Sequence, residues 1–158
     1  MTAQEFKAKL DAAEKSPEKI AAAVLQLPRA TLHYKPAPDR WCILEILGHL
    51  ADMEILYGYR IRQMIADKEP TIAPVDQDAW ARNLGYCELS APEAVALYSL
   101  NRRANLRLLR RLRPDDLERS AFHPEYRRQF KLAEIVERMA AHGPNHLEQI
   151  ERLKKHAA

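Results

Sequence analysis

Residues 131–155 read KLAEIVERMAAHGPNHLEQIERLKK, a stretch that combines a helical period with two histidines four residues apart. Its apolar residues recur at three- and four-residue steps, the spacing of one face of an α-helix. At about 100° per residue, His146 lies about 20° and His142 about 60° from Met139, the centre of that face. We therefore predict a long helix that turns both histidines toward a helical core. Its inward residues are Leu132, Ile135, Val136, Met139, Leu147, Ile150 and Leu153.

Gly143 and Pro144 separate the two histidines. A proline inside a helix removes one backbone hydrogen bond and kinks the axis. We expect either a kinked helix that widens the core, or one helix that ends at His142 and a second that begins at Pro144. Zincin proteases require H-E-x-x-H with the glutamate as general base, and Gly143 occupies that position, so this protease class is excluded.

Three further helical segments are expected upstream. The first is a broken arm that begins with a capping box over Thr2–Glu5 and restarts at Ser16, with Pro17 at the first helical position. Apolar stripes predict a second helix from about Trp41 to Asp67 and a third from about Pro92 to Arg113. The inward residues are Phe6, Leu10, Ala13, Ile20, Val24 and Leu27 in the arm, Ile43, Ile46, Leu47, Leu50, Met53, Tyr57, Ile61 and Met64 in the second helix, and Leu97, Leu100, Ala104, Leu108 and Leu112 in the third.

Two long connections, residues 68–86 and 113–130, join these helices. Neither shows a helical or strand period, and we expect both to be irregular. They are too long for simple turns between neighbouring helices, so at least one crosses the length of the bundle. The sequence therefore predicts a single all-α domain over residues 1–158, a four-helix bundle with a long crossover connection and a broken first helix.

Composition excludes several classes of protein. The chain has 158 residues and a net charge of +3, and no apolar run approaches the roughly 20 residues that span a membrane. Its N-terminal stretch has mixed charge and no apolar signal-peptide core, which predicts a cytoplasmic protein without membrane association. Cys42 and Cys87 cannot form a disulfide framework and lack the spacing of a zinc knuckle, so we expect two free thiols that are buried or half-buried.

Six arginines lie between Arg102 and Arg113, within the third predicted helix. Their spacing predicts a basic, solvated outer face. A nucleic-acid surface would need exposed aromatic residues beside the basic groups, and no aromatic residue lies between Tyr98 and Phe122. We therefore expect no specific binding of nucleic acid.

A third histidine lies in the stretch ILGHLADME at residues 46–54. His49 falls about 100° from Leu50, at the flank of the apolar face of the second helix. Three histidines from two helices would give a divalent metal three ligands and leave coordination positions open, as in catalytic sites. The spacing is equally compatible with separate core histidines, each hydrogen-bonded to another partner. The residues alone leave both alternatives open.

Three stretches resemble motifs of the DinB/YfiT-like family, a family of metalloenzyme candidates. They are PAPDRWCILEILGHLADME at 36–54, FHPEYRRQFKLAEIVERMAAH at 122–142 and HGPNHLEQIERL at 142–153. The chain departs from the family pattern in three places. Cys42 replaces the usual Ser or Thr before the second helix, Arg127 replaces a common Gly, and Gly143-Pro144 separates two histidines.

The resemblance implies a four-helix bundle with a long crossover and a divalent transition metal, often nickel or zinc. The metal ligands that it implies are His49, His142 and His146. It also implies a thiol-dependent S-transferase that uses a low-molecular-weight thiol such as bacillithiol or mycothiol. A metal-dependent hydrolase and a non-enzymatic stress-response or binding module remain alternatives. The expected partners are a small-molecule substrate and a second copy of the chain in a homodimer.

Polar residues near the three histidines are candidates to orient them. They are Asp52, Asn145 and Gln149, with an ordinary surface position as the alternative for Asp52. Of the remaining histidines, His33 and His156 are expected at the surface, and His123 is expected to stabilise a His-Pro turn, with a place at the mouth of a cavity as the alternative.

Overall fold

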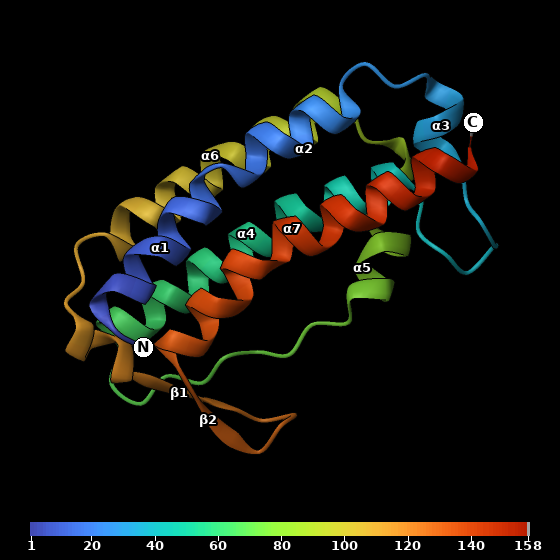
Figure 1. Cartoon of the computed structure of the whole chain (residues 1–158). Helices are drawn as coiled ribbons and strands as arrows, with labels where there is room; N and C mark the ends of the chain where they lie inside the picture. Colours follow the sequence, from blue (N-terminus) through green and yellow to red (C-terminus); the bar gives the residue numbers. More distant parts are fainter. Residues whose placement is uncertain (158) are drawn as a thin grey trace.

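Four long helical segments form an elongated bundle in the computed structural model, which describes residues 1–157 (Figure 1). This architecture confirms the predicted all-α four-helix bundle. Ala158, the last residue of the predicted domain 1–158, lies outside the described residues, and no helix within 1–157 is long and apolar enough to cross a membrane. The segments are a broken arm of α1 (Ala3–Glu14) and α2 (Ser16–Val24), followed by α4 (Ile43–Ala66), α6 (Ala91–Leu109) and α7 (Leu132–His156).

The arm begins and breaks where the sequence predicts. Thr2 Oγ1 accepts a hydrogen bond from the Glu5 amide at 3.2 Å, and Glu5 Oε2 accepts one from the Thr2 amide at 2.7 Å. Lys15 separates α1 from α2, and Pro17 fits the first turn of α2 because that position needs no amide hydrogen. The short helix α3 (Arg29–His33) then leads the chain toward α4.

The predicted long crossover joins α4 to α6. Figure 1 shows that these two helices run in the same direction, so the chain must return along the outside of the bundle between them. The connection is not irregular as predicted, because it contains α5 (Gln77–Asn83) and the 3-10 turn η1 (Tyr86–Glu88). Asp76 caps α5 by accepting a hydrogen bond from the Ala79 amide at 2.9 Å. A helix of 7 residues is too short to leave a clear period in the sequence.

The second connection contains a β-hairpin, which corrects the prediction of an irregular loop. After the 3-10 turn η2 (Pro114–Glu118), β1 (Ser120–His123) pairs antiparallel with β2 (Arg128–Lys131). Arg127 has a φ of +50° in the turn, the left-handed region that glycine adopts at no steric cost. The crossover is attached to the hairpin by a parallel bridge at Phe122. Strands of 4 residues are too short to show the alternation by which strands are recognised in sequence.

Helices α4 and α7 bury the faces that the sequence predicts, with Leu147 half-buried. α7 continues through Pro144 as one helix, so the alternative of two separate helices is wrong. Gly143 is buried where α7 packs against α2 and α6. A Cβ at this position would overlap Ser16 Oγ and lie 2.5 Å from Tyr98 Oη. The missing side chain therefore lets α7 approach closely and fixes the rotation of this helix about its axis.

The inward face predicted for α6 is only partly correct, because Ala104, Leu108 and Leu112 are half-buried and the other two residues are exposed. Leu97 and Leu100 are 50% and 55% exposed, whereas Arg102 is fully buried. Arg102 reaches Glu54 of α4 at 2.7 Å, so the side of the helix that carries Arg102 faces the core and the side that carries Leu97 and Leu100 faces solvent. The helix also ends earlier than predicted, at Leu109.

Candidate metal centre

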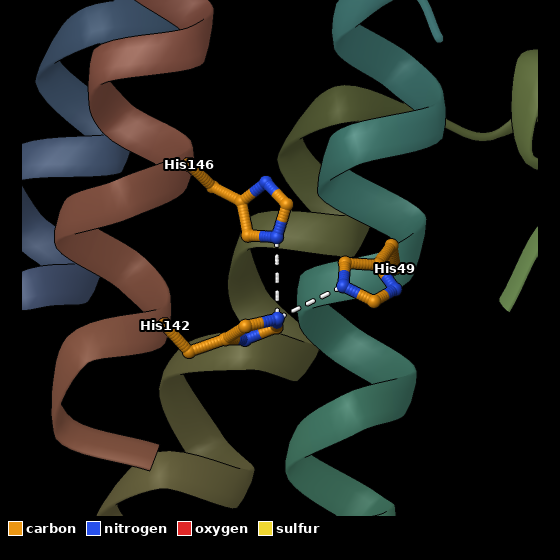
Figure 2. A group of neighbouring side chains, drawn as sticks. All are labelled: His49, His142 and His146. Atoms are coloured by element: carbon orange, nitrogen blue, oxygen red, sulfur yellow. Dashed lines mark hydrogen bonds between the residues drawn. The ribbon is translucent and has the colours of Figure 1, made fainter. Parts of the chain in front are cut away.

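Three histidines from two helices meet inside the bundle, as Figure 2 shows. His49 lies on α4, and His142 and His146 lie one turn apart on α7. Nε2 of His142 is 2.9 Å from Nε2 of His49 and 3.2 Å from Nε2 of His146. Ring nitrogens of all three residues lie within 4.8 Å of one another, an arrangement that could hold a metal ion. The structure thus brings together the three histidines that the sequence singles out.

A glycine beside a histidine on each helix sets this geometry. Figure 1 shows α4 and α7 side by side along the bundle. Gly143 follows His142 and makes the close contact with α2 and α6 described above. Gly48 precedes His49, and a Cβ there would lie 2.6 Å from the ring of Tyr86 in η1. Both helices are therefore held by close contacts directly next to a histidine of the centre.

Burial keeps the three imidazoles neutral. It lowers the pKa of His49 to about 3 and the pKa of His142 to about 2, and the neighbouring histidines add to the effect. Burial also lowers the pKa of His146, although its hydrogen bond with Gln149 opposes this. A neutral imidazole has one unprotonated ring nitrogen with a free lone pair. Each ring can therefore donate a lone pair to a cation at neutral pH.

Gln149 selects the tautomer of His146. His146 Nδ1 lies 3.0 Å from Gln149 Oε1, which can only accept, so the ring hydrogen is on Nδ1. Nε2 is then left with its lone pair directed toward His142 (Figure 2). Such a hydrogen bond to the outer ring nitrogen is typical of metal-binding histidines, because it fixes the orientation of the ring.

The donor set fits a first-row divalent cation. Tetrahedral zinc binds imidazole nitrogen at about 2.0–2.1 Å, which places two ligand nitrogens about 3.3 Å apart. The two Nε2 separations of 2.9 and 3.2 Å are close to this value. Three neutral imidazoles that face one another cannot all satisfy their inner nitrogens by mutual hydrogen bonds, whereas one cation accepts all three lone pairs.

Two aromatic side chains flank the centre. The ring of Trp41 lies 4.8 Å from that of His49, and the ring of Tyr57 lies 5.8 Å from that of His142, measured between centroids. Trp41 is held in place because its Nε1 donates to Asp78 Oδ1 of α5 at 3.0 Å. Burial raises the pKa of Tyr57 to about 12, so its hydroxyl keeps its proton. The two rings thus form part of the surroundings in which the histidines are buried.

Of the three polar residues predicted to orient the histidines, Gln149 alone contacts one within residues 1–157. Asp52 Oδ2 instead accepts a hydrogen bond from Tyr86 Oη at 2.5 Å, and Asn145 is exposed. His123 is buried at the end of β1, directly before the hairpin turn that begins at Pro124. The last two histidines are His33, half-buried in α3, and His156, exposed at the end of α7.

The sequence did not predict the buried ion pair between Glu54 and Arg102. Glu54 and Arg102 are both fully buried, and the charge of Arg102 adds to burial and the neighbouring histidines in lowering the pKa of His142. One signal could have revealed the pair. Glu54 falls about 40° from Leu50, inside the apolar face of its helix, and an acidic residue there requires a buried partner.

The fold and the three histidines define a helical bundle with an internal candidate metal centre. The family model of the DinB superfamily matches residues 12–150. The chain therefore belongs to the DinB superfamily, which confirms the resemblance found in the sequence.

Several bacterial proteins are similar over most of the chain. One from Oceanobacillus iheyensis is 28% identical over 142 residues, or 90% of this chain and 81% of the relative. One from Bacillus mycoides is 27% identical with the same coverage. Both are named "Putative metal-dependent hydrolase".

A solved structure shares the fold. YfiT from Bacillus subtilis matches with a TM-score of 0.93 over 99% of this chain and 89% of that chain, at 20% identity. It is described as "a probable metal-dependent hydrolase with an unusual four-helix bundle topology". At this level of identity the likeness shows a common fold, and the parallel α4 and α6 of the present bundle agree with a topology other than simple up-and-down.

Proposed function

We propose that His49, His142 and His146 bind one divalent transition metal ion, with zinc or nickel expected, and that the protein is a metal-dependent hydrolase of a small-molecule substrate. The convergence of three neutral Nε2 atoms, at 2.9 and 3.2 Å, carries the proposal. Three protein ligands leave coordination positions open for reactants, as in catalytic zinc sites. The names of the relatives support hydrolysis as the reaction.

The chain's own residues would position and protect this centre. The cation, when bound, supplies Lewis acidity, which lowers the pKa of an attacking water and polarises the bond to be broken. Gln149 orients His146 through the 3.0 Å hydrogen bond at Nδ1. Trp41 and Tyr57 form part of its buried surroundings, and the buried charge of Arg102 opposes protonation of His142.

The S-transferase that the sequence resemblance implies stays a prediction. A low-molecular-weight thiol would use the same open positions as water, and the same cation would stabilise its thiolate. The two reactions therefore differ in their nucleophile and can be separated by their need for a thiol. The homodimer and the cytoplasmic location also stay predictions.

Metal content tests the first half of the proposal. Protein purified without added metal should contain about one zinc or nickel ion per chain at the histidine centre, measured by elemental analysis. His146→Ala removes a ligand and should lower the metal content by about one ion per chain relative to the wild type. His156→Ala changes an exposed residue at the end of α7 and serves as the matched control. Equal occupancy in the two variants would refute the assignment of the centre.

Activity assays test the second half. The metal-loaded protein is offered panels of esters, amides and phosphoesters, and separately panels of electrophiles with a thiol. Hydrolysis that needs no thiol and is lost both in a chelator and in His146→Ala supports the hydrolase. Turnover that strictly requires a thiol would establish the transferase instead. Stoichiometric metal binding without turnover on either panel would favour the non-enzymatic module.

A further inference from the structure

Cys42 and Cys87 form a second cluster of potential ligands at the start of α4. Both are free thiols, buried and half-buried as the sequence predicts, and their sulfur atoms lie 3.7 Å apart across 45 positions of the chain. A carboxylate oxygen of Glu45 completes the cluster, and all three ligand atoms lie within 4.8 Å of one another. None of these residues belongs to the histidine centre.

The crossover holds Cys87 firmly beside Cys42. Cys42 is the N-cap residue of α4, and Cys87 lies in η1. Tyr86 attaches η1 to α4, because its ring occupies the space that a side chain at Gly48 would need and its hydroxyl donates to Asp52 at 2.5 Å. Two attachments on the residue next to Cys87 therefore fix its sulfur against the N-terminus of α4.

The surroundings of the cluster would stabilise two thiolates and a carboxylate that bind a divalent cation. The N-terminus of a helix stabilises negative charge, including that of a thiolate. Burial alone would raise the pKa of Glu45, but hydrogen bonds from Lys35 at 2.7 Å and from the Cys42 amide at 2.8 Å hold it below its ordinary value. Two thiolates, one carboxylate, the Lys35 ammonium and a divalent cation together sum to zero charge.

The thiols themselves are poorly suited to redox catalysis. Burial raises the pKa of Cys42 to about 12 and also raises the pKa of Cys87. The reactive form of cysteine is the thiolate, so two protonated thiols make a slow nucleophilic pair. A coordinating metal ion, in contrast, removes the proton of a thiol directly.

We propose that Cys42, Cys87 and Glu45 form a second metal site, which binds one thiophilic divalent cation of the zinc class. Tetrahedral zinc, with sulfur at about 2.3 Å, separates two thiolates by about 3.8 Å, and the sulfurs here are 3.7 Å apart. A cavity of about 390 Å³, lined in part by Lys35 and Trp41, reaches Glu45 of the cluster. The side chain of Lys35 is 33% exposed, so it can move aside and free Glu45 Oε1 for the ion.

The consequence is a tether between the crossover and α4. The ion would join η1 to the first turn of α4, next to Trp41, which lies over His49. The second site would therefore stabilise the position of Trp41 beside the histidine centre. This role does not depend on the reaction at that centre.

Cobalt titration of the reduced, metal-free protein tests this site. Thiolate ligands give Co²⁺ a charge-transfer band in the near ultraviolet, and histidine ligands do not. Wild type should bind two equivalents and show the band. Cys42→Ser/Cys87→Ser should lose the band and one equivalent, while His142→Ala/His146→Ala should keep the band and lose the other equivalent. The two double variants thus separate a failure of this site from a failure of the histidine centre.

A second measurement uses only the wild-type chain. One equivalent of Cd²⁺ should make both cysteines unreactive toward a thiol reagent, with intact mass showing that both thiols are free at the start. A cobalt complex without the charge-transfer band, or cysteines that react at the same rate with and without Cd²⁺, would overturn the second site. Protein that is isolated with a Cys42–Cys87 disulfide and shows no band after reduction would overturn it equally.

Discussion

Arg102 on α6 and Glu54 on α4 form an ion pair at 2.7 Å in which both side chains are fully buried. Asn105 Nδ2 donates to Glu54 Oε2 at 3.1 Å, and Arg102 Nη2 donates to Tyr98 Oη at 3.2 Å. Burial raises the pKa of Glu54, and the charge of Arg102 opposes this rise. The network joins two parallel helices directly behind the histidine centre.

Removal of one partner of this pair should be strongly destabilising. Arg102→Met leaves Glu54 buried without its cation, so we expect a loss of about 3–5 kcal/mol in the free energy of unfolding, measured by urea denaturation. Glu54→Leu/Arg102→Met should recover much of this loss, because no uncompensated charge remains. The exposed neighbour provides the control, and Arg103→Met should change stability by no more than about 0.5 kcal/mol. Equal losses at positions 102 and 103 would contradict the buried pair.

Gln149→Leu should weaken metal binding without removing a ligand. The substitution keeps the approximate volume but deletes the acceptor for His146 Nδ1, so the ring loses its fixed tautomer and orientation. We expect an affinity for zinc about 10–100-fold lower, measured by competition with a chromogenic chelator. Glu148→Leu alters the exposed adjacent residue and should have little effect. If the two variants bind zinc alike, the proposed role of Gln149 is wrong.

The metal-free protein should lose stability in mild acid. The pKa values of His49 and His142 are about 3 and about 2 in the folded chain, whereas an unfolded histidine titrates near about 6.5. Between these values the unfolded chain binds more protons, so the free energy of unfolding falls as the pH drops below about 6.5 and is insensitive to these groups above it. The slope approaches about 1.4 kcal/mol per pH unit for each histidine.

Urea denaturation at several pH values between about 5 and 8 measures this slope. His49→Gln has no titrating group at that position, and its stability should therefore depend less steeply on pH than that of the wild type. The expectation fails if both proteins show the same slope.

The exposed arginines of α6 should not form a nucleic-acid site. Arg103 and Arg107 on α6 and Arg111 just beyond it are exposed and make no ion pair within residues 1–157, whereas the exposed Arg110 donates to both carboxylate oxygens of Glu14 in the arm, at 3.0 and 2.7 Å. A gel-shift assay near physiological salt should give a Kd no tighter than about 10⁻⁶ M. Reversal of Arg103, Arg107 and Arg111 to Glu should leave the metal content unchanged. Tight, salt-sensitive DNA binding that this triple variant loses would contradict the prediction.

The sequence predicts the buried faces of α4 and α7 correctly, because one local period runs through each of them. The faces of α4 and α7 are buried as predicted, because an apolar stripe at helical spacing has a single energetically favourable orientation. The same period places His142 and His146 on one inward face. His49 is different, since its angle leaves it at the flank of α4, and the family resemblance linked it to the other two.

The short elements and the polar part of the core were not predicted from the sequence. The hairpin strands have 4 residues each and α5 has 7, which is too few to establish a period. The buried face of α6 was missed because an arginine is expected in solvent. Arg102 is an exception only because Glu54, on another helix, neutralises it in the core.

By itself, the sequence determined the helical class, the broken arm, the crossover and the inward direction of two histidines. The tertiary structure alone decided which distant side chains meet, as Cys42 meets Cys87 and Arg102 meets Glu54. The physical reason is the separation along the chain of the residues that determine each feature. A helical face is defined by neighbours three and four residues away, whereas a partner depends on the direction of each helix and on close contacts such as that at Gly143, which exist only in the complete fold.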